Sequence, residues 1–161
     1  MSNTIREIII LDFLSRAAAI TVANGYNTGI GANVIRARKK LDPDECPAAV
    51  IIPGTEKSEA KYGQNACKMT MRVEGIAEFG TSDPSVVSEQ ILGDLKKCFL
   101  SPANILTSPV SGWSRSPDYI DSIVYTEGGT QEYPDEGQVT VGAFVTFEVG
   151  YTTKLNDPCS Q

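Results

Sequence analysis

The chain has 161 residues, of which 41% are hydrophobic and 21% charged, and its formal net charge is −6. This length and composition fit one globular domain over residues 1–161, which would bury roughly 70% of the surface that its unfolded chain exposes. The acidic balance argues against general attraction to nucleic acid, and the first residues have neither the basic segment of a signal peptide nor an apolar run that could span a membrane. We therefore expect a protein that stays in the cytoplasm where it is made.

The residue types that common catalytic and metal sites need are absent or scattered. The sequence has no histidine, and its cysteines, Cys46, Cys67, Cys98 and Cys159, form no CxxC pair. We expect reduced, structural thiols, with disulfides as the alternative. No nucleophile or phosphate-binding motif is present, so we expect no catalytic, cofactor-binding or metal-binding residue and no cofactor.

The first third of the chain predicts one helix, a loop and two short strands. Apolar residues recur at three- and four-residue steps over residues 3–22, with Arg16 on another face, and this helix should end near Asn24 and Gly25. The glycine-rich residues 27–33 lack the third glycine and the following helix of a nucleotide-binding fingerprint, so they predict a flexible loop. Residues 34–41 and 48–52 are expected to be strands, the second closed by Pro53 and Gly54.

The middle of the chain predicts a long strand and a second helix. Residues 56–65 are polar and join two strands, either as a projecting arm or as a mobile loop. Cys67 to Phe79 alternates apolar and polar residues, which indicates a strand with one dry face. Asp83 can cap a helix over residues 84–100, with Ile91 and Phe99 on the buried stripe and Asp94 outside.

The last third predicts two strands. Residues 119–126 alternate as a strand, Gly128 and Gly129 begin a turn, and Gln138 to Thr152 forms the longest alternating run, while the tail after Thr153 is expected to be loose. The element order α-β-β-β-α-β-β predicts an α+β fold. It should contain a mainly antiparallel or mixed β-sheet of about five strands with two α-helices packed on one face.

Charge is unevenly distributed along the chain. A basic cluster and a later acidic cluster are our candidates for subunit contacts: Arg36, Arg38, Lys39 and Lys40, and Glu127, Glu132, Asp135 and Glu136. We hypothesise that these clusters face each other across, or flank, a boundary between copies of the chain. Trp113 is a further candidate for a subunit contact, the alternative being a ring folded back over its own core.

Several segments together resemble the tail terminator proteins of long-tailed bacteriophages. They are the opening helix TIREIILDFL, the strand that ends in Gly80 before DPSVVSEQILGDLKKCFL, the turn YPDEG, the strand VTVGAFVTFEVGYTT and the closing Asn156-Asp157-Pro158. The resemblance implies a virion protein that forms a homohexameric ring at the head-proximal end of the tail tube. Such a ring stops tube polymerisation, joins the tail-tube protein to a neck or head-completion protein, and lets genomic DNA pass without specific binding.

Two other kinds of protein remain open. A neck, head-completion or tail-tube subunit would have a similar build. A nucleic-acid-binding module that uses the RARKK stretch would be of a different class, and the acidic net charge disfavours it.

Overall fold

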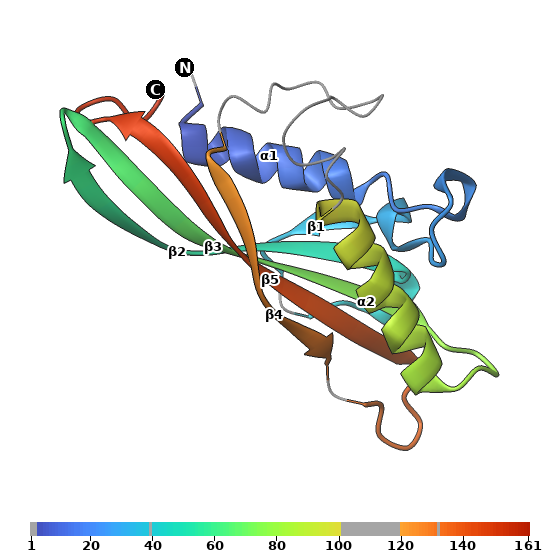
Figure 1. Ribbon diagram of the computed structural model, residues 1–161. Helices are drawn as coiled ribbons and strands as arrows, with labels where there is room; N and C mark the ends of the chain where they lie inside the picture. Colours follow the sequence, from blue (N-terminus) through green and yellow to red (C-terminus); the bar gives the residue numbers. More distant parts are fainter. Residues whose placement is uncertain (1–2, 39, 101–119, 132) are drawn as a thin grey trace.

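Two helices lie on the same face of a five-stranded sheet in the computed structural model, which describes residues 3–38, 40–100, 120–131 and 133–161 (Figure 1). The strand order is β1-β2-β3-β5-β4; β1 runs parallel to β2 and the other pairs are antiparallel. The predicted α+β fold, with about five strands and two helices, is confirmed. Within the described residues the elements are α1 (Ile5–Ala17), η1 (Val22–Asn24), η2 (Ile30–Ala32), β1 (Val34–Arg36), η3 (Pro43–Glu45), β2 (Ala48–Lys61), β3 (Gln64–Glu78), α2 (Pro84–Leu100), β4 (Ser122–Thr130) and β5 (Thr140–Lys154).

The core lies between the helices and the central strands. Alternate residues of β3 and β5 point into it, and the side chains of Met71 and Val145 are completely buried. At its centre three buried rings meet: Phe13 of α1 stacks on Phe99 of α2 with centroids 5.0 Å apart, and Phe147 of β5 lies 5.6 Å from Phe99. These rings bury large apolar areas, so they join both helices to the sheet.

Helix α1 is shorter than predicted. It begins where the hydroxyl of Thr4 accepts a hydrogen bond from the backbone N–H of Glu7, and it ends at Ala17. Gly25, at a φ of 82°, closes the short turn η1 and not the helix. Arg16 was expected on another face but is only 4% exposed. Burial lowers the pKa of Arg16 to about 10, against the opposing charge of Asp12, so the guanidinium stays charged at neutral pH.

Helix α2 begins and ends as predicted, but one of its residues is placed differently. Asp83 caps the helix by accepting from the backbone N–H of Ser85 at 2.8 Å. Asp94, expected outside, is fully buried because its carboxylate accepts four hydrogen bonds of 2.7–3.0 Å from the backbone and side chains of Asn27 and Thr28. The glycine-rich segment expected to be a flexible loop is therefore tied to α2 and contains the turn η2.

Strand β2 continues well beyond its predicted end at Pro53 and Gly54. Its pairing with β3 shifts register between Pro53 and Glu56 and then continues to Lys61. A two-residue turn at Tyr62 and Gly63, with φ values of 48° and 81°, leads into β3. The polar segment thus forms a projecting β-hairpin (upper left in Figure 1), which confirms the first of the two alternatives. We call residues 55–67 the arm.

The edge strands also differ from their predicted bounds. β1 has only three residues, because Ala37 turns into the left-handed region at a φ of 55° while its N–H still donates to the carbonyl of Ile51. β4 contains Gly128 and Gly129, which were expected to turn the chain, and accommodates them after a register shift between Tyr125 and Glu127. The predictions for β3 and β5 were correct to within three residues.

The tail after Thr153, expected to be loose, returns to the start of the chain. The carbonyl of Pro158 accepts a hydrogen bond from the N–H of Ile5 at 2.8 Å. The carboxylate of Asp157 accepts from the N–H of Cys159 and the hydroxyl of Ser160, which lowers the pKa of Asp157. These contacts place the C-terminus beside α1 and the arm.

Candidate subunit interfaces

The basic cluster lies at the β1 edge of the sheet, and much of its charge is used within the chain. Arg36 donates two hydrogen bonds, of 2.6 and 2.7 Å, to the carboxylate of Glu7 on α1. This pair lowers the pKa of Glu7 and raises that of Arg36. Arg38 binds the carboxylate of Glu45, whose pKa is lowered first by the backbone N–H of Asp42 and then by Arg38.

The positive charge that the basic cluster can offer a partner therefore depends on its two lysines, Lys39 and Lys40. Lys40 is exposed, and no ion pair to it is present among the described residues. Lys39 lies outside the described residues. The free positive charge at this edge is thus smaller than the sequence suggested.

The acidic candidates lie at the opposite edge of the sheet. Glu127 is an exposed residue of β4, and Asp135 and Glu136 are exposed in the turn between β4 and β5. Two hydrogen bonds fix this turn, from the N–H of Gln138 to the carbonyl of Asp135 and from the N–H of Asp135 to the side chain of Gln138. Glu132 and Trp113 lie outside the described residues. The basic and acidic clusters are therefore at opposite sides of one sheet, not next to each other.

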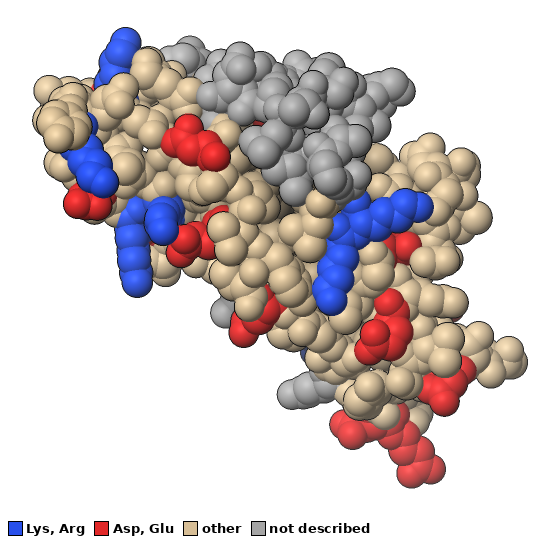
Figure 2. All heavy atoms as spheres, in the orientation of Figure 1, with Lys and Arg blue, Asp and Glu red and all other residues tan. Residues whose placement is uncertain are grey.

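The fold gathers more negative charge around the acidic turn than the sequence indicated. The end of β3 and the start of α2 lie at the same end of the molecule as this turn (Figure 1), and the N–H of Phe79 donates to the carbonyl of Val139. Figure 2 shows carboxylates without cations at this end (lower right). The described residues of 78–90 and 130–140 contain no lysine or arginine. We call the exposed carboxylates here the acidic end: Glu78, Asp83, Glu89, Asp135 and Glu136.

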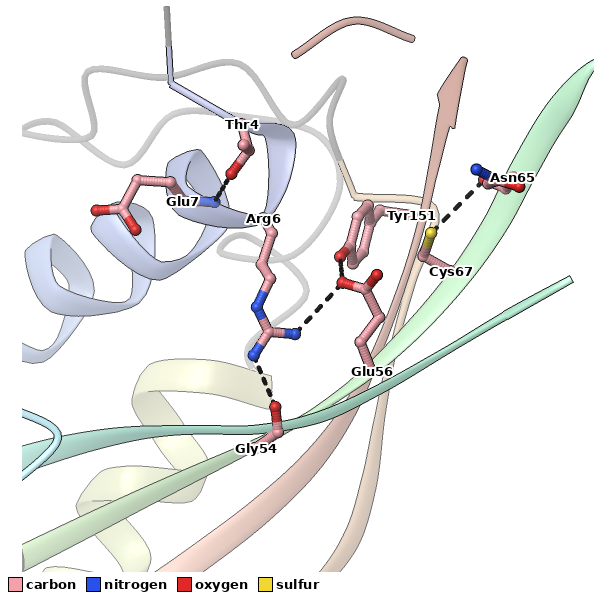
Figure 3. A network of polar contacts seen from close by, with 8 residues as sticks. All are labelled: Thr4, Arg6, Glu7, Gly54, Glu56, Asn65, Cys67 and Tyr151. Atoms are coloured by element: carbon pink, nitrogen blue, oxygen red, sulfur yellow. Dashed lines mark hydrogen bonds and ion pairs between the residues drawn. The ribbon is translucent and has the colours of Figure 1, made fainter. Parts of the chain in front are cut away.

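The base of the arm is held by a polar network that sequence reasoning missed (Figure 3). Arg6 of α1 donates to the carbonyl of Gly54 at 2.6 Å and forms an ion pair with Glu56 at 3.3 Å. The hydroxyl of Tyr151 on β5 donates to the same carboxylate. Burial and the nearby Glu56 raise the pKa of Tyr151, so it remains a neutral donor. One carboxylate thus connects α1, β2 and β5.

A cleft of about 210 Å³ opens beside this network. Cys67 lies in its wall, and its thiol donates to the carbonyl of Asn65. No disulfide is present among the four cysteines. The described residues contain no group of three or more His, Cys, Asp or Glu side chains that could hold a metal ion. None of the described helices has the length and apolar character needed to cross a membrane.

Comparison of the sequence with protein-family models and with curated proteins found no match.

Proposed function

We propose that this chain is a structural virion protein, the tail terminator of a long-tailed bacteriophage. Copies of it would form a hexameric ring at the head-proximal end of the tail tube. One side of the ring would stop the growth of the tail-tube protein, and the other would join a neck or head-completion protein. Genomic DNA would pass through the centre, and the protein would carry out no chemical reaction.

The observation that best supports this proposal is the location of the two charged clusters. A closed ring needs a heterologous contact, in which two different patches of one subunit meet on neighbouring copies. The chain carries exposed Lys40 near the β1 edge, where Arg36 and Arg38 already pair with Glu7 and Glu45, and it carries Glu127 and Asp135 near the β4 edge. Opposite edges are where a subunit would contact its two neighbours, and unlike charges there favour one orientation of the contact.

The fold also favours this proposal over a nucleic-acid-binding module. Such a module would need the RARKK stretch free to neutralise phosphates. Arg36 and Arg38 instead hold Glu7 and Glu45. A ring built from acidic chains would repel the DNA backbone, which fits a channel that DNA crosses without binding.

Electron microscopy of the purified protein is the direct test. We expect single rings that do not grow in length, and we expect these rings to make unterminated tails competent to join heads. Long cylinders would instead identify a tail-tube subunit. Particles that remain monomeric at high concentration and leave unterminated tails inactive would contradict the proposal.

A further inference from the structure

The tip of the arm exposes apolar side chains next to lysines. Tyr62 is fully exposed, at 104% of its reference surface, and Leu155 is 47% exposed. The two are neighbours because the N–H of Leu155 donates to the carbonyl of Gly63. Exposed Lys61 and Lys154 flank them, since Lys61 pairs with Gln64 and Gln64 pairs with Lys154. We call Lys61, Tyr62, Lys154 and Leu155 the arm tip.

Tyr62 is an unfavourable choice for its position. It takes the left-handed conformation, with a φ of 48°, at the first place of a two-residue hairpin turn. That place favours asparagine, aspartate or glycine, and a bulky side chain there costs folding energy. The exposed ring gains nothing from the core in return. A strained, exposed aromatic residue at the end of a fixed arm therefore points to a role in binding a partner.

The acidic end offers a matching surface. Val86, Tyr133 and Val139, each at least half exposed, lie in the same segments as Asp83, Asp135 and Glu136. Apolar side chains with carboxylates around them complement apolar side chains with lysines around them. Glu59, 4.0 Å from Lys61, and Asp157 reduce the charge of the arm tip. The acidic end contains no cation among its described residues, so its carboxylates are available to pair with Lys61 and Lys154 of the arm tip.

We propose that the arm tip of one copy docks on the acidic end of the next copy in the ring. Tyr62 and Leu155 would cover Val86 and Val139, while Lys61 and Lys154 would face Asp135 and Glu136. This inference rests on the proposed ring and names the contact that closes it. It keeps the acidic half of the contact expected from the sequence but replaces the basic half, because Arg36 and Arg38 already hold carboxylates within the chain.

The arm is already held in place within a single subunit, before any contact with another copy. Arg6, Glu56 and Tyr151 fix the base of the arm against α1 and β5. A pre-ordered arm loses little conformational entropy when it docks. The contact joins two different surfaces, so it can repeat from copy to copy until the ring closes.

The first test removes the ring of Tyr62 without harming the turn. Tyr62→Asn suits the left-handed position, so the subunit should fold at least as well as the unchanged protein. We expect the protein concentration at half-assembly, measured by analytical ultracentrifugation, to rise about tenfold or more, as when an interface aromatic is removed. Val22→Thr, at another exposed apolar residue outside both surfaces, should leave that concentration unchanged and serves as the control.

A mixing experiment tests the direction of the contact. The double variant Asp135→Lys, Glu136→Lys keeps the arm tip, and Tyr62→Asn keeps the acidic end. Each variant alone should fail to form rings at concentrations where the unchanged protein does. A mixture of the two should give heterodimers, because only one of the two possible contacts is intact.

The possible failures separate the two proposals. Full rings from Tyr62→Asn at unchanged concentration would overturn the arm-tip contact and leave the proposed terminator ring standing. Larger closed rings from the mixture would overturn it as well. An unchanged protein that never assembles would overturn both proposals.

Discussion

The half of the sheet beneath the helices and the arm are parts of the same β-sheet, yet they are stabilised in different ways. Under α1 and α2, alternate side chains are buried and three phenylalanine rings meet. In the arm, residues 55–62 are all exposed, and Lys57 lies directly opposite Lys68, an unfavourable pair of like charges. Hydrophobic burial therefore stabilises the first region, whereas strand pairing and a few polar contacts stabilise the second.

Replacing Phe147 by alanine should cause the largest loss of stability, and it tests whether burial holds the helix-covered region. Phe147 is completely buried and contacts Phe13 and Phe99, so the change removes apolar contacts and leaves a cavity. We expect the free energy of unfolding to fall by about 3–5 kcal/mol, measured by chemical denaturation. Val124→Ala, at an exposed position of β4, is the control and should cost under about 0.5 kcal/mol. A loss below about 1 kcal/mol for Phe147→Ala would mean that the three rings are not the centre of the core.

Asp94→Asn should have an intermediate effect in the helix-covered region. The amide keeps the size of the carboxylate but loses its charge and cannot accept all four hydrogen bonds from Asn27 and Thr28. We expect a loss of about 2–3 kcal/mol, the usual cost of disrupting buried, charge-assisted hydrogen bonds. Hydrogen exchange should accelerate most over residues 27–33. Glu89→Gln, at an exposed position of the same helix, is the matched control. Equal effects of the two changes would show that the hydrogen bonds to Asp94 do not hold the loop to α2.

Arg6→Met should have the smallest effect on overall stability and should act mainly on the arm. Methionine keeps an apolar side chain at this position but removes the hydrogen bond to Gly54 and the ion pair with Glu56. We expect the free energy of unfolding to fall by about 1 kcal/mol. Two buried thiols report on the two regions: Cys67 lies where the arm joins the core, and Cys98 lies on α2 in the core beneath the helices. Burial raises the pKa of both thiols, that of Cys98 to about 12, so both should react slowly with an alkylating reagent while their regions are closed.

We therefore expect Arg6→Met to speed alkylation of Cys67 more than that of Cys98, as measured by peptide mass spectrometry under native conditions. Lys68→Met, which removes an exposed ion pair with Glu148 on the other side of the sheet, is the control. Parallel acceleration of both thiols would show that the arm opens only when the whole domain unfolds.

The same contrast explains how much of the fold the sequence predicts. β3 and β5 alternate regularly because one face of each is buried, so their positions follow from the pattern. The second half of β2 has no such alternation, since both of its faces are exposed, and the sequence therefore left a projecting arm and a mobile loop as alternatives. Its strand conformation comes from pairing with β3 across the turn at Tyr62 and Gly63, a tertiary effect that local periodicity does not encode.

The candidate interfaces were predictable only as separate charges. Arg36 and Glu127 can be read from the sequence as members of opposite clusters, but the bond from Arg36 to Glu7 depends on how α1 lies over β1. Asp94 carries a charge on a helix, which usually predicts exposure, and only the returning loop at Asn27 gives it partners. The arm network was missed because Arg6, Glu56 and Tyr151 are far apart in the sequence.

The uninterrupted pairing of β3 with β5 has a mechanical consequence. The two strands pair from Gln64 and Lys154 near the arm tip to Glu78 and Thr140 near the acidic end, without a register shift. A force pulling these two ends apart acts along the strands, where two extended backbones carry it and the hydrogen bonds between them keep both strands straight. The paired strands β3 and β5 therefore act as a stiff rod, and a displacement at one end of the subunit is passed to the other end with little stretching.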